Sequence, residues 1–270
     1  MDAIVTSVVC YNNEDEIVSY AKEVSKQHCE NEIVLVVTCN SCRDVELLTR
    51  DVLAILPNAR VFDPHKNLGY LPGCLYGISC LNMEYKWAMI SNTDIRFGNE
   101  RFFRDFLDSV PHGVWCVGPN IVLSQTGERQ NPFLANRPSQ RLIERWKLIY
   151  SSKILFHAYY KLSRLKRKYK KNKSVIDQSG SVYAVHGSCF ALNKECIQRV
   201  TDLHIPIFMY EEELLIAEIV RSNNGSIHYC CDATVYHDEN QVTGRVSVSQ
   251  KLHWIRESYN YIYNAFYKHN

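Results

Sequence analysis

Apolar and polar positions follow two alternating periods along the first 120 residues. Four short apolar runs have the length and composition of buried strands, and two longer stretches repeat their apolar positions every three or four residues, as amphipathic helices do. The strand-like runs are residues 3–11, 32–39, 60–63 and 86–91, and the helix-like stretches are residues 15–29 and 44–56. Strands and helices that alternate at this spacing form βαβ units. The sequence therefore predicts an α/β fold with a mostly parallel central sheet and helices on both faces.

The second half of the chain is less regular. Helix-like patterns cover residues 98–110, 141–171, 211–222 and 248–268, and strand-like patterns cover residues 181–192, 226–229 and 233–237. The chain has no internal repeat or low-complexity linker. We therefore expect a single domain over residues 1–240, divided into halves at about residue 120, and a C-terminal helix over residues 241–270.

Composition excludes several classes of protein. The 270 residues are 46% hydrophobic and 22% charged, which is ordinary for a globular chain, and 8 Pro and 11 Gly are too few for a disordered one. No apolar run approaches the roughly 18 residues that a membrane span needs. Asp2, with no basic residue before Lys22, argues against a secretory signal.

The 11 cysteines fit the reduced thiols of a cytoplasmic protein, because a chain of this length buries a core without disulfides. Cys39 and Cys42 form a C-x-x-C pair. The other close pair, Cys230 and Cys231, is adjacent and lacks the spacing of a second zinc-binding half. We expect buried thiols, with a structural zinc site as the alternative.

Residues 141–173 concentrate the positive charge of the chain. They hold twelve Lys and Arg against one acid, a net charge of +11, which leaves −9 for the remainder. On helical spacing, Leu155, Tyr159, Leu162 and Tyr169 share one face, and Lys161, Arg164, Lys168 and Lys171 share the opposite face. Such a basic amphipathic helix is typical of binding to an anionic membrane surface or an acidic partner. The alternative is a solvated helix that docks on the domain through its apolar stripe.

Polar residues follow each of the four predicted strands, in segments 11–13, 38–41, 64–67 and 91–94. Ligands of open parallel sheets bind outside the carboxyl ends of the strands, so these segments predict a binding crevice. In Asn92-Thr93-Asp94, the carboxylate is placed to hold Mg²⁺ or Mn²⁺, which prefer oxygen ligands. The same tripeptide is also ordinary turn chemistry.

Three adjacent acids, Glu211, Glu212 and Glu213, open a predicted helix. Their mutual repulsion raises the pKa of at least one carboxyl, which makes it a better general base near neutral pH. The alternative is structural, because acids in the first turn of a helix are favoured by its dipole. His237 ends an apolar strand, where it is either a ligand or a hydrogen-bonded structural residue.

The order of these motifs resembles the family 2 glycosyltransferases, and in particular their bacterial rhamnosyltransferase-like group. The motifs are Tyr11-Asn12, Cys39-Asn40-Ser41, Asn67-Leu68-Gly69, Asn92-Thr93-Asp94, Gly118-Pro119-Asn120 with Gly127, Val185-His186-Gly187-Ser188, and residues 208–213 with Ala217-Glu218, Gly225 and Val235-Tyr236-His237. They cover about residues 3–240. No single motif is specific, whereas seven in this order are.

The resemblance implies a GT-A fold, with a nucleotide-sugar half over residues 1–120 and an acceptor half over residues 121–240. It implies inverting transfer of a sugar from a UDP- or dTDP-linked donor to a saccharide or lipid-linked saccharide, with Mg²⁺ or Mn²⁺ as cofactor. It assigns nucleotide-sugar binding to Tyr11, Asn12, Thr38, Asn40, Asn67, Gly69, Asn92 and Asp94, metal binding to Asp94 and His237, the acceptor side to Gly187, Ser188 and Tyr210, and catalysis to Glu213 with Glu212. The implied setting is bacterial surface polysaccharide synthesis, in the cytoplasm or at the inner face of the cell membrane.

Two positions depart from the family pattern. Thr38 stands where many members have Asp, so a contact to the pyrimidine or ribose is lost or moves to Asn40. The base position holds Glu213 rather than Asp, one methylene longer. A Tyr-x-Glu-Glu pattern occurs in the rhamnosyltransferase-like group, so we interpret this as a variant of the site.

The sequence is compatible with three other functions. A nucleotidyltransferase on a similar sheet would favour a basic, Gly-rich loop after the first strand, where residues 11–16 offer acids instead. A nucleic-acid-binding protein could use the basic segment, but the −9 of the remainder repels phosphates and no base-reading module is present. We therefore expect no nucleic-acid partner. A catalytically inactive family member is the third rival, and metal-dependent donor hydrolysis would separate it from an active enzyme.

Overall fold

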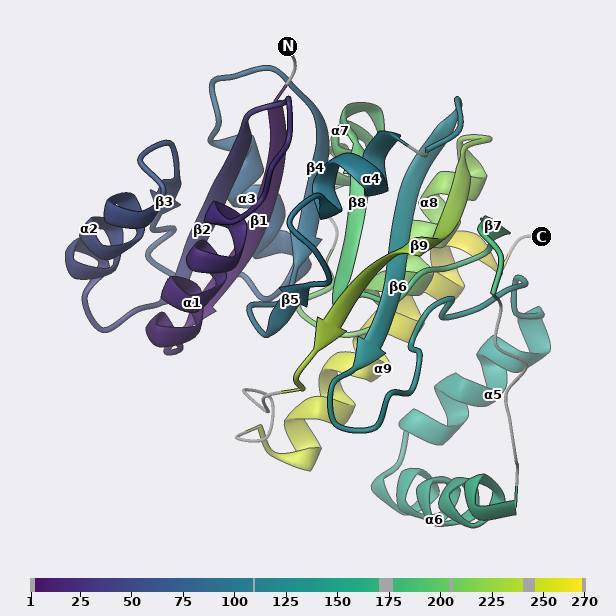
Figure 1. The fold of residues 1–270 in the computed structure, drawn as a ribbon. Coiled ribbons are helices and arrows are strands. Elements are labelled where there is room, and N and C mark those ends of the chain that lie inside the picture. The colour runs from purple at the N-terminus through teal and green to yellow at the C-terminus, as the bar shows by residue number, and fades with distance from the viewer. Residues whose placement is uncertain (1–2, 109, 170–176, 204–205, 240–245, 269–270) are drawn as a thin grey trace.

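The computed structural model describes residues 3–108, 110–169, 177–203, 206–239 and 246–268 (Figure 1). Within these ranges nine strands form one sheet, in the order β3-β2-β1-β4-β8-β6-β9-β5, with β7 paired to β9. The strands are β1 (Ala3–Tyr11), β2 (Ile33–Ser41), β3 (Arg60–Phe62), β4 (Tyr85–Ser91), β5 (Ile95–Phe97), β6 (Val114–Leu123), β7 (Gly180–Val182), β8 (Cys189–Asn193) and β9 (Ser226–His237). The α/β class predicted from the sequence is confirmed.

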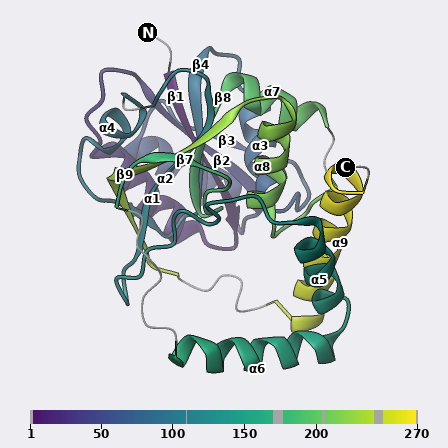
Figure 2. The same cartoon turned by 90° about the vertical axis from the view of Figure 1, so that its right-hand side faces the viewer.

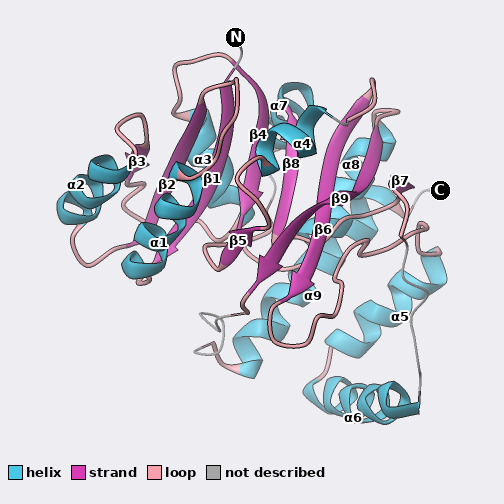
Figure 3. Ribbon diagram, viewed as in Figure 1, coloured by secondary structure: helices cyan, strands magenta, loops and turns pink. Residues whose placement is uncertain are grey.

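Helices cover both faces of the sheet (Figure 3). They are α1 (Glu14–Ser25), α2 (Val45–Ile55), α3 (Leu71–Ser79), α4 (Phe102–Asp108), α5 (Gln140–Tyr150), α6 (Lys153–Tyr169), α7 (Lys194–Asp202), α8 (Glu212–Ser222) and α9 (Val248–Phe266). One core cluster unites α1, α2 and α4 with the sheet, and a second unites α3, α7, α8 and α9 with its other face. Successive strand residues supply the two clusters in turn, because side chains of a strand alternate between its faces.

The first half of the sheet is parallel, and the second half is mixed, with β6 and β9 paired in parallel. Strand β1 pairs in parallel with β2 and β4, and β2 with β3. Strand β8 then runs antiparallel between β4 and β6, and β5 and β7 pair antiparallel with β9. The parallel pairing predicted from the sequence is therefore found throughout the βαβ half and again between β6 and β9, while β5, β7 and β8 add antiparallel pairs.

Several elements differ from the sequence prediction in the second half. The expected strand over residues 181–192 is two strands, β7 and β8, and residues 226–237 form one continuous strand rather than two. Strand β6 was not predicted, because Gly118 and Pro119 lie in its middle. Its pairing with β9 shifts register between Pro119 and Asn120, and such a bulge is a position that tolerates proline in a strand.

The basic segment is two helices rather than one. Helix α5 packs against α9, with the Tyr150 and Tyr259 rings stacked 5.4 Å apart at 14°. Helix α6 extends from it along the edge of the molecule (Figures 1 and 2). Ile154, Leu155 and Leu162 of α6 are exposed, so the alternative, in which an apolar stripe docks this helix on the domain, does not hold for these residues. Tyr169 and the basic side chains beyond Lys161 lie outside the described side chains.

A buried carboxylate ties the C-terminal helix to the domain. Glu218 of α8 is fully buried and accepts hydrogen bonds from Arg137 at 2.7 Å and from Tyr183 at 2.6 Å. Arg137 also donates to the carbonyl of Phe266 at 3.1 Å and lies over the ring of Tyr267.

Among the described residues, no helix is long and apolar enough to cross a membrane.

Candidate active site

The carboxyl ends of β1 and β2 are joined at the predicted nucleotide side. The backbone N–H of Asn12 donates to the carbonyl of Ser41 at 2.7 Å, and the Ser41 hydroxyl donates to Asn12 Oδ1 at 3.0 Å. Asn12 has a positive φ of 55°, which turns the chain at the end of β1. Beside this junction Tyr11 is 46% exposed, so its ring is available to a ligand.

Asn40 holds the loop that contains Asn67 and Gly69. Its amide nitrogen donates to the carbonyl of Gly69 at 2.7 Å, and its oxygen accepts from the N–H of Leu68 at 3.2 Å. Asn67 Oδ1 accepts from the Gly69 N–H at 2.9 Å, while the rest of the Asn67 side chain is exposed. Asn40 therefore shapes this side of the site chiefly through the loop.

Gly69 brings the nucleotide side into contact with the acceptor side. Its φ is +87°, and a Cβ at this position would lie 1.9 Å from the carbonyl oxygen of Phe208. The same carbonyl accepts from the N–H of Tyr70 at 3.1 Å. Only glycine fits here, because a side chain would meet both the backbone of Phe208 and an unfavourable φ. The loops predicted to bind donor and acceptor are therefore neighbours.

Thr38 does not reach the site. It is fully buried, and Gly77 of α3 lies so close that a Cβ there would be 2.5 Å from Thr38 Oγ1. The prediction that Thr38 contacts the nucleotide is wrong in this structure, because α3 covers the side chain. A threonine at this position fills the space between β2 and α3.

Thr93 fixes the turn between Asn92 and Asp94. Its hydroxyl donates to Glu16 Oε2 at 2.8 Å and accepts from Asn13 Nδ2 at 2.9 Å, so it faces α1. Asn13 occupies the N-cap position of α1, but its side chain makes no capping hydrogen bond and joins this network instead. Thr93 thus turns away from its two neighbours, which leaves Asn92 and Asp94 at the carboxyl end of β4.

Asp94 and His237 lie together because β5 pairs antiparallel with β9, which places Ile95 opposite His237. His237 Nε2 is 3.3 Å from Asp94 Oδ1, and the two side chains are only 7% and 8% exposed. Asn92 Nδ2 is 3.5 Å from the same imidazole nitrogen. The backbone N–H of Asp238 donates to the carbonyl of Asp94 at 3.0 Å, which holds the two segments in register.

Gln130 orients the imidazole of His237. Its Oε1 is 2.8 Å from His237 Nδ1, and its Nε2 donates to Glu239 Oε1 at 3.2 Å. Since the carboxylate of Glu239 requires the NH₂ group on its side, the amide oxygen faces the imidazole and the ring proton is on Nδ1. The other ring nitrogen, Nε2, faces Asp94. No sequence pattern marks Gln130, because it lies 107 positions from His237 along the chain.

These residues fit a bound Mg²⁺ or Mn²⁺. Asp94 offers a carboxylate oxygen, His237 an imidazole nitrogen, and Asn92 an amide group beside that imidazole. No group of three or more His, Cys, Asp or Glu suited to a metal occurs among the described residues. A cation here would thus take its other ligands from water and a diphosphate, as these ions commonly do.

Glu213 is held by the loop before β8. The backbone N–H of Gly187 donates to Glu213 Oε1 at 2.9 Å, and Tyr70 donates to the carbonyl of Gly187 at 2.8 Å. A Cβ on Gly187 would lie 2.9 Å from Glu213 Oε1 and 3.0 Å from Glu212 Oε1. The glycine therefore allows both carboxylates to approach the backbone closely.

The backbone before α8 is strained. Tyr210 and Glu211 have φ angles of 71° and 66°, in the left-handed region that non-glycine residues rarely adopt. The Tyr210 hydroxyl is buried and has no hydrogen-bond partner among the described residues. Strain of this kind clusters at ligand and active sites.

The three adjacent carboxyls, Glu211, Glu212 and Glu213, all have raised pKa values. Burial, followed by the charge of Glu213, raises the pKa of Glu211 to about 8 and that of Glu212 well above its ordinary value. Burial also raises the pKa of Glu213. Backbone N–H groups favour the charged form of both members of the pair, those of Glu212 and Tyr210 at Glu212 and those of Glu213 and Gly187 at Glu213. A carboxyl with a raised pKa is better suited to act as a general base near neutral pH.

Residues 186–188 connect the Asp94 side to the Glu213 side. The Ser188 carbonyl accepts from the N–H of Asn92 at 2.8 Å, and the His186 ring lies 6.3 Å from the His237 ring. Gly187, between them, contacts Glu213. Asn131 accepts from the His186 N–H at 2.6 Å, and neither Asn131 nor His186 was among the predicted site residues. Ser188 is buried, and its hydroxyl is 3.0 Å from His186 Nδ1, so it supports the segment.

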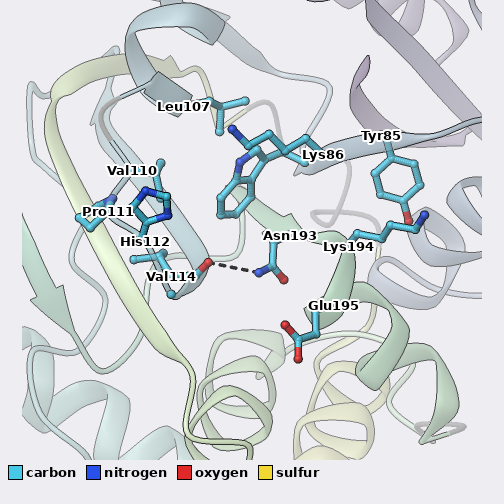
Figure 4. A pocket seen from close by; sticks show the side chains of 12 residues that line it. Tyr85, Lys86, Leu107, Val110, Pro111, His112, Val114, Asn193, Lys194 and Glu195 are labelled. Carbon is cyan, nitrogen blue, oxygen red and sulfur yellow. Dashed lines mark hydrogen bonds between the residues drawn. The ribbon is translucent and has the colours of Figure 1, made fainter. Parts of the chain in front are cut away.

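A cavity of about 370 Å³ lies elsewhere (Figure 4). Its walls come from the amino ends of β4 and β6 and the start of α7, and they include Tyr85, Lys86, His112, Asn193 and Lys194. None of the predicted site residues lines it. This cavity therefore lies at the amino ends of β4 and β6, apart from the predicted site residues.

No family model and no curated protein matches the chain. Among solved structures it is similar to GalNAc-T7 with UDP, GalNAc and Mn²⁺, with a TM-score of 0.65 and 11% identity over 100% of this chain and 48% of that one. It is also similar to TarS of S. aureus, residues 1–349, in complex with UDP, with a TM-score of 0.56 and 13% identity over 87% of this chain and 60% of that one. A second structure of this TarS segment gives a TM-score of 0.54 at 13% identity, over 88% of this chain and 61% of that one.

The chain spans less than two thirds of the length of these proteins. Similarity to solved structures at 11–13% identity shows that this chain shares their fold. The chain has the GT-A glycosyltransferase fold that the order of its motifs implied.

Proposed function

We propose that the protein is an inverting glycosyltransferase that moves a sugar from a UDP- or dTDP-linked donor to a hydroxyl of a saccharide or lipid-linked saccharide. The observation that carries the proposal is the continuity of the site. Asp94 and His237 on one side and Glu213 on the other are joined by the single segment 186–188. The similarity to GalNAc-T7 and TarS, whose structures contain UDP, supports a nucleotide-sugar donor.

The donor half of the site binds the nucleoside diphosphate. Asp94 and His237, with Asn92, would hold Mg²⁺ or Mn²⁺, which neutralises the charge that develops on the departing diphosphate. Tyr11 stacks on the pyrimidine from the end of β1, because its ring is exposed there. Asn12, Asn40, Asn67 and Gly69 shape the nucleotide pocket through the hydrogen bonds of the two loops.

Glu213 performs the proton transfer. It takes the proton of the acceptor hydroxyl as that oxygen forms its bond to the anomeric carbon, while the bond from that carbon to the diphosphate oxygen breaks. Attack from the face opposite the leaving group inverts the configuration. A positioned general base contributes about 10²–10⁴ to the rate.

The acceptor side is formed by Gly187 and Tyr210, with Ser188 beneath them. Tyr210 offers a hydroxyl without a hydrogen-bond partner among the described residues, and a sugar hydroxyl would supply one. We place the reaction in bacterial surface polysaccharide synthesis, following the motif resemblance, in the cytoplasm at the inner face of the cell membrane.

Two substitutions test the proposal. Glu213→Gln abolishes turnover and retains donor binding, whereas Asp94→Asn weakens binding of Mn²⁺ and of the nucleotide sugar. Donor binding is measured by thermal shift with UDP- and dTDP-sugars with and without Mn²⁺, and turnover by release of the nucleoside diphosphate. Glu195→Gln is a matched control, because this exposed acid opens α7 much as Glu213 lies at the start of α8.

Near-normal turnover in Glu213→Gln would eliminate the assignment of the base. Release of pyrophosphate from a nucleoside triphosphate and a sugar phosphate would indicate the nucleotidyltransferase instead. Wild-type protein that binds donor and shows no metal-dependent hydrolysis or transfer would be an inactive member of the fold.

A further inference from the structure

An apolar face of α6 is open to solvent at the edge of the molecule. Ile154 is 80% exposed, Leu162 59% and Leu155 41%. With Tyr159 they recur at helical spacing, so they form one stripe along the helix. Leu148, at the end of the neighbouring α5, is 62% exposed as well. Side chains of this size rarely lie uncovered in a continuous row on a soluble protein, and such rows mark contact surfaces.

The contact between α6 and α5 uses another side of the helix. The Phe156 ring lies 5.9 Å from the Tyr150 ring. Successive residues of a helix are about 100° apart, so Phe156 lies about 160° from Ile154 and about 120° from Leu162, beyond the Tyr159 margin of the stripe. The helix is thus attached through one side, while the stripe lies on another.

Positive charge accompanies the stripe. Lys153 and Lys161 of α6 and Arg141 and Arg145 of α5 are exposed, and residues 141–173 together carry a net charge of +11. Two copies of the chain that met through this face would bring the four exposed cations of each copy close together, so self-association is opposed electrostatically. The partner must therefore offer both an apolar interior and a negative surface.

We infer that α6 lies in the headgroup region of an anionic lipid bilayer, with Ile154, Leu155, Tyr159 and Leu162 turned into the acyl boundary and the lysines toward the lipid phosphates. A helix that lies in the interface in this way has an apolar face and a basic face, and it is too polar as a whole to cross the bilayer. Anionic lipids attract such a cluster of Lys and Arg, and the attraction falls off within a Debye length of the surface.

The position of α6 relates this surface to the active site. Figures 1 and 2 both place α6 beyond the end of the sheet toward which β1, β6 and β9 run, and β9 ends at His237. A bilayer under α6 would thus lie on the side of the molecule that holds the strand ends. Only this last step, in which the membrane presents a lipid-linked acceptor, rests on the proposed function.

The experiment is flotation of the full chain with vesicles of phosphatidylcholine alone or with about 30% phosphatidylglycerol. We expect binding to the anionic vesicles, at least about tenfold weaker binding to the neutral ones, and loss of binding when NaCl rises from about 50 to about 500 mM. Ile154→Asp combined with Leu162→Asp should reduce binding at least about tenfold, because two charges then oppose insertion. Leu47→Asp on α2 is the control, since Leu47 is also exposed, at 42%.

The control and the double variant should both keep the melting temperature of the wild type, because all three side chains are exposed. Equal binding to neutral and anionic vesicles, or unchanged binding in the double variant, overturns the inference. So does a dimer of the wild type that dissociates in the double variant, since the stripe would then join two copies. Flotation is independent of turnover, so its failure leaves the proposed transfer reaction standing.

Discussion

Replacement of Gly187 by alanine tests the geometry of the base most directly. The added Cβ would lie 2.9 Å from Glu213 Oε1 and 3.0 Å from Glu212 Oε1, where ordinary contacts begin near 3.4 Å. The carboxylates must therefore move by about half an ångström or more. A misplacement of about 1 Å costs roughly 10²-fold in rate, so we expect Gly187→Ala to lower kcat by about 10- to 100-fold.

The assay is steady-state release of the nucleoside diphosphate, with KM for the donor measured alongside kcat. KM for the donor should be nearly unchanged, because the Asp94 side of the site is not displaced. Gly180→Ala is the matched control, since a Cβ at Gly180 meets nothing within 4 Å. Wild-type kcat in Gly187→Ala, or an equal loss in Gly180→Ala, would refute the reasoning.

Three further outcomes follow from the contacts described. Gln130→Met removes the acceptor of the His237 Nδ1 proton and should weaken Mn²⁺ binding about 10- to 100-fold by electron paramagnetic resonance. Gln130→Glu, which keeps an acceptor, should retain tighter binding than Gln130→Met, and comparable loss in both would contradict the role. Arg137→Met leaves the carboxylate of Glu218 with one cation fewer and should lower the free energy of unfolding by about 3 kcal/mol in urea titrations. An unchanged free energy of unfolding would show that the contact between Arg137 and Glu218 makes no net contribution to stability. The pKa of Glu211, raised from 4.5 to about 8 by burial and the charge of Glu213, makes a contribution to stability that is full below pH 4.5 and lost as pH rises through 8. Glu211→Gln should remove this loss, so its melting temperature should fall less than that of the wild type between about pH 5 and pH 9, and parallel curves would count against the assignment.

The first half of the fold was predictable because the hydrophobic periodicity of its sequence is strong and local. Strand β1 and helix α2 lie within a residue or two of the expected ranges, since a buried apolar run and an amphipathic repeat need no tertiary information. Strand β6 was missed because Gly118 and Pro119 are unfavourable inside a strand, and the bulge against β9 accommodates them. The exposed stripe of α6 was predicted as a pattern, but whether it docks on the domain depends on packing.

The candidate site, like the fold, contains some residues that sequence motifs identify and others that only tertiary packing reveals. Asp94, His237 and Glu213 could be selected from the order of motifs, because each follows or precedes a recognisable element. Gln130, in contrast, acts through contacts that span over 100 positions of sequence. Thr38 could not be excluded without α3 in place, since a residue after a strand is either covered or exposed according to the helix that follows.

The contact of Gly69 and Tyr70 with the Phe208 carbonyl has a kinetic consequence. One backbone oxygen is shared by the loop that meets the donor and the segment that leads to the base, so neither can shift without the other. Occupancy of either site should then change the affinity of the other by the same factor, so the KM measured for one substrate should depend on the concentration of the other.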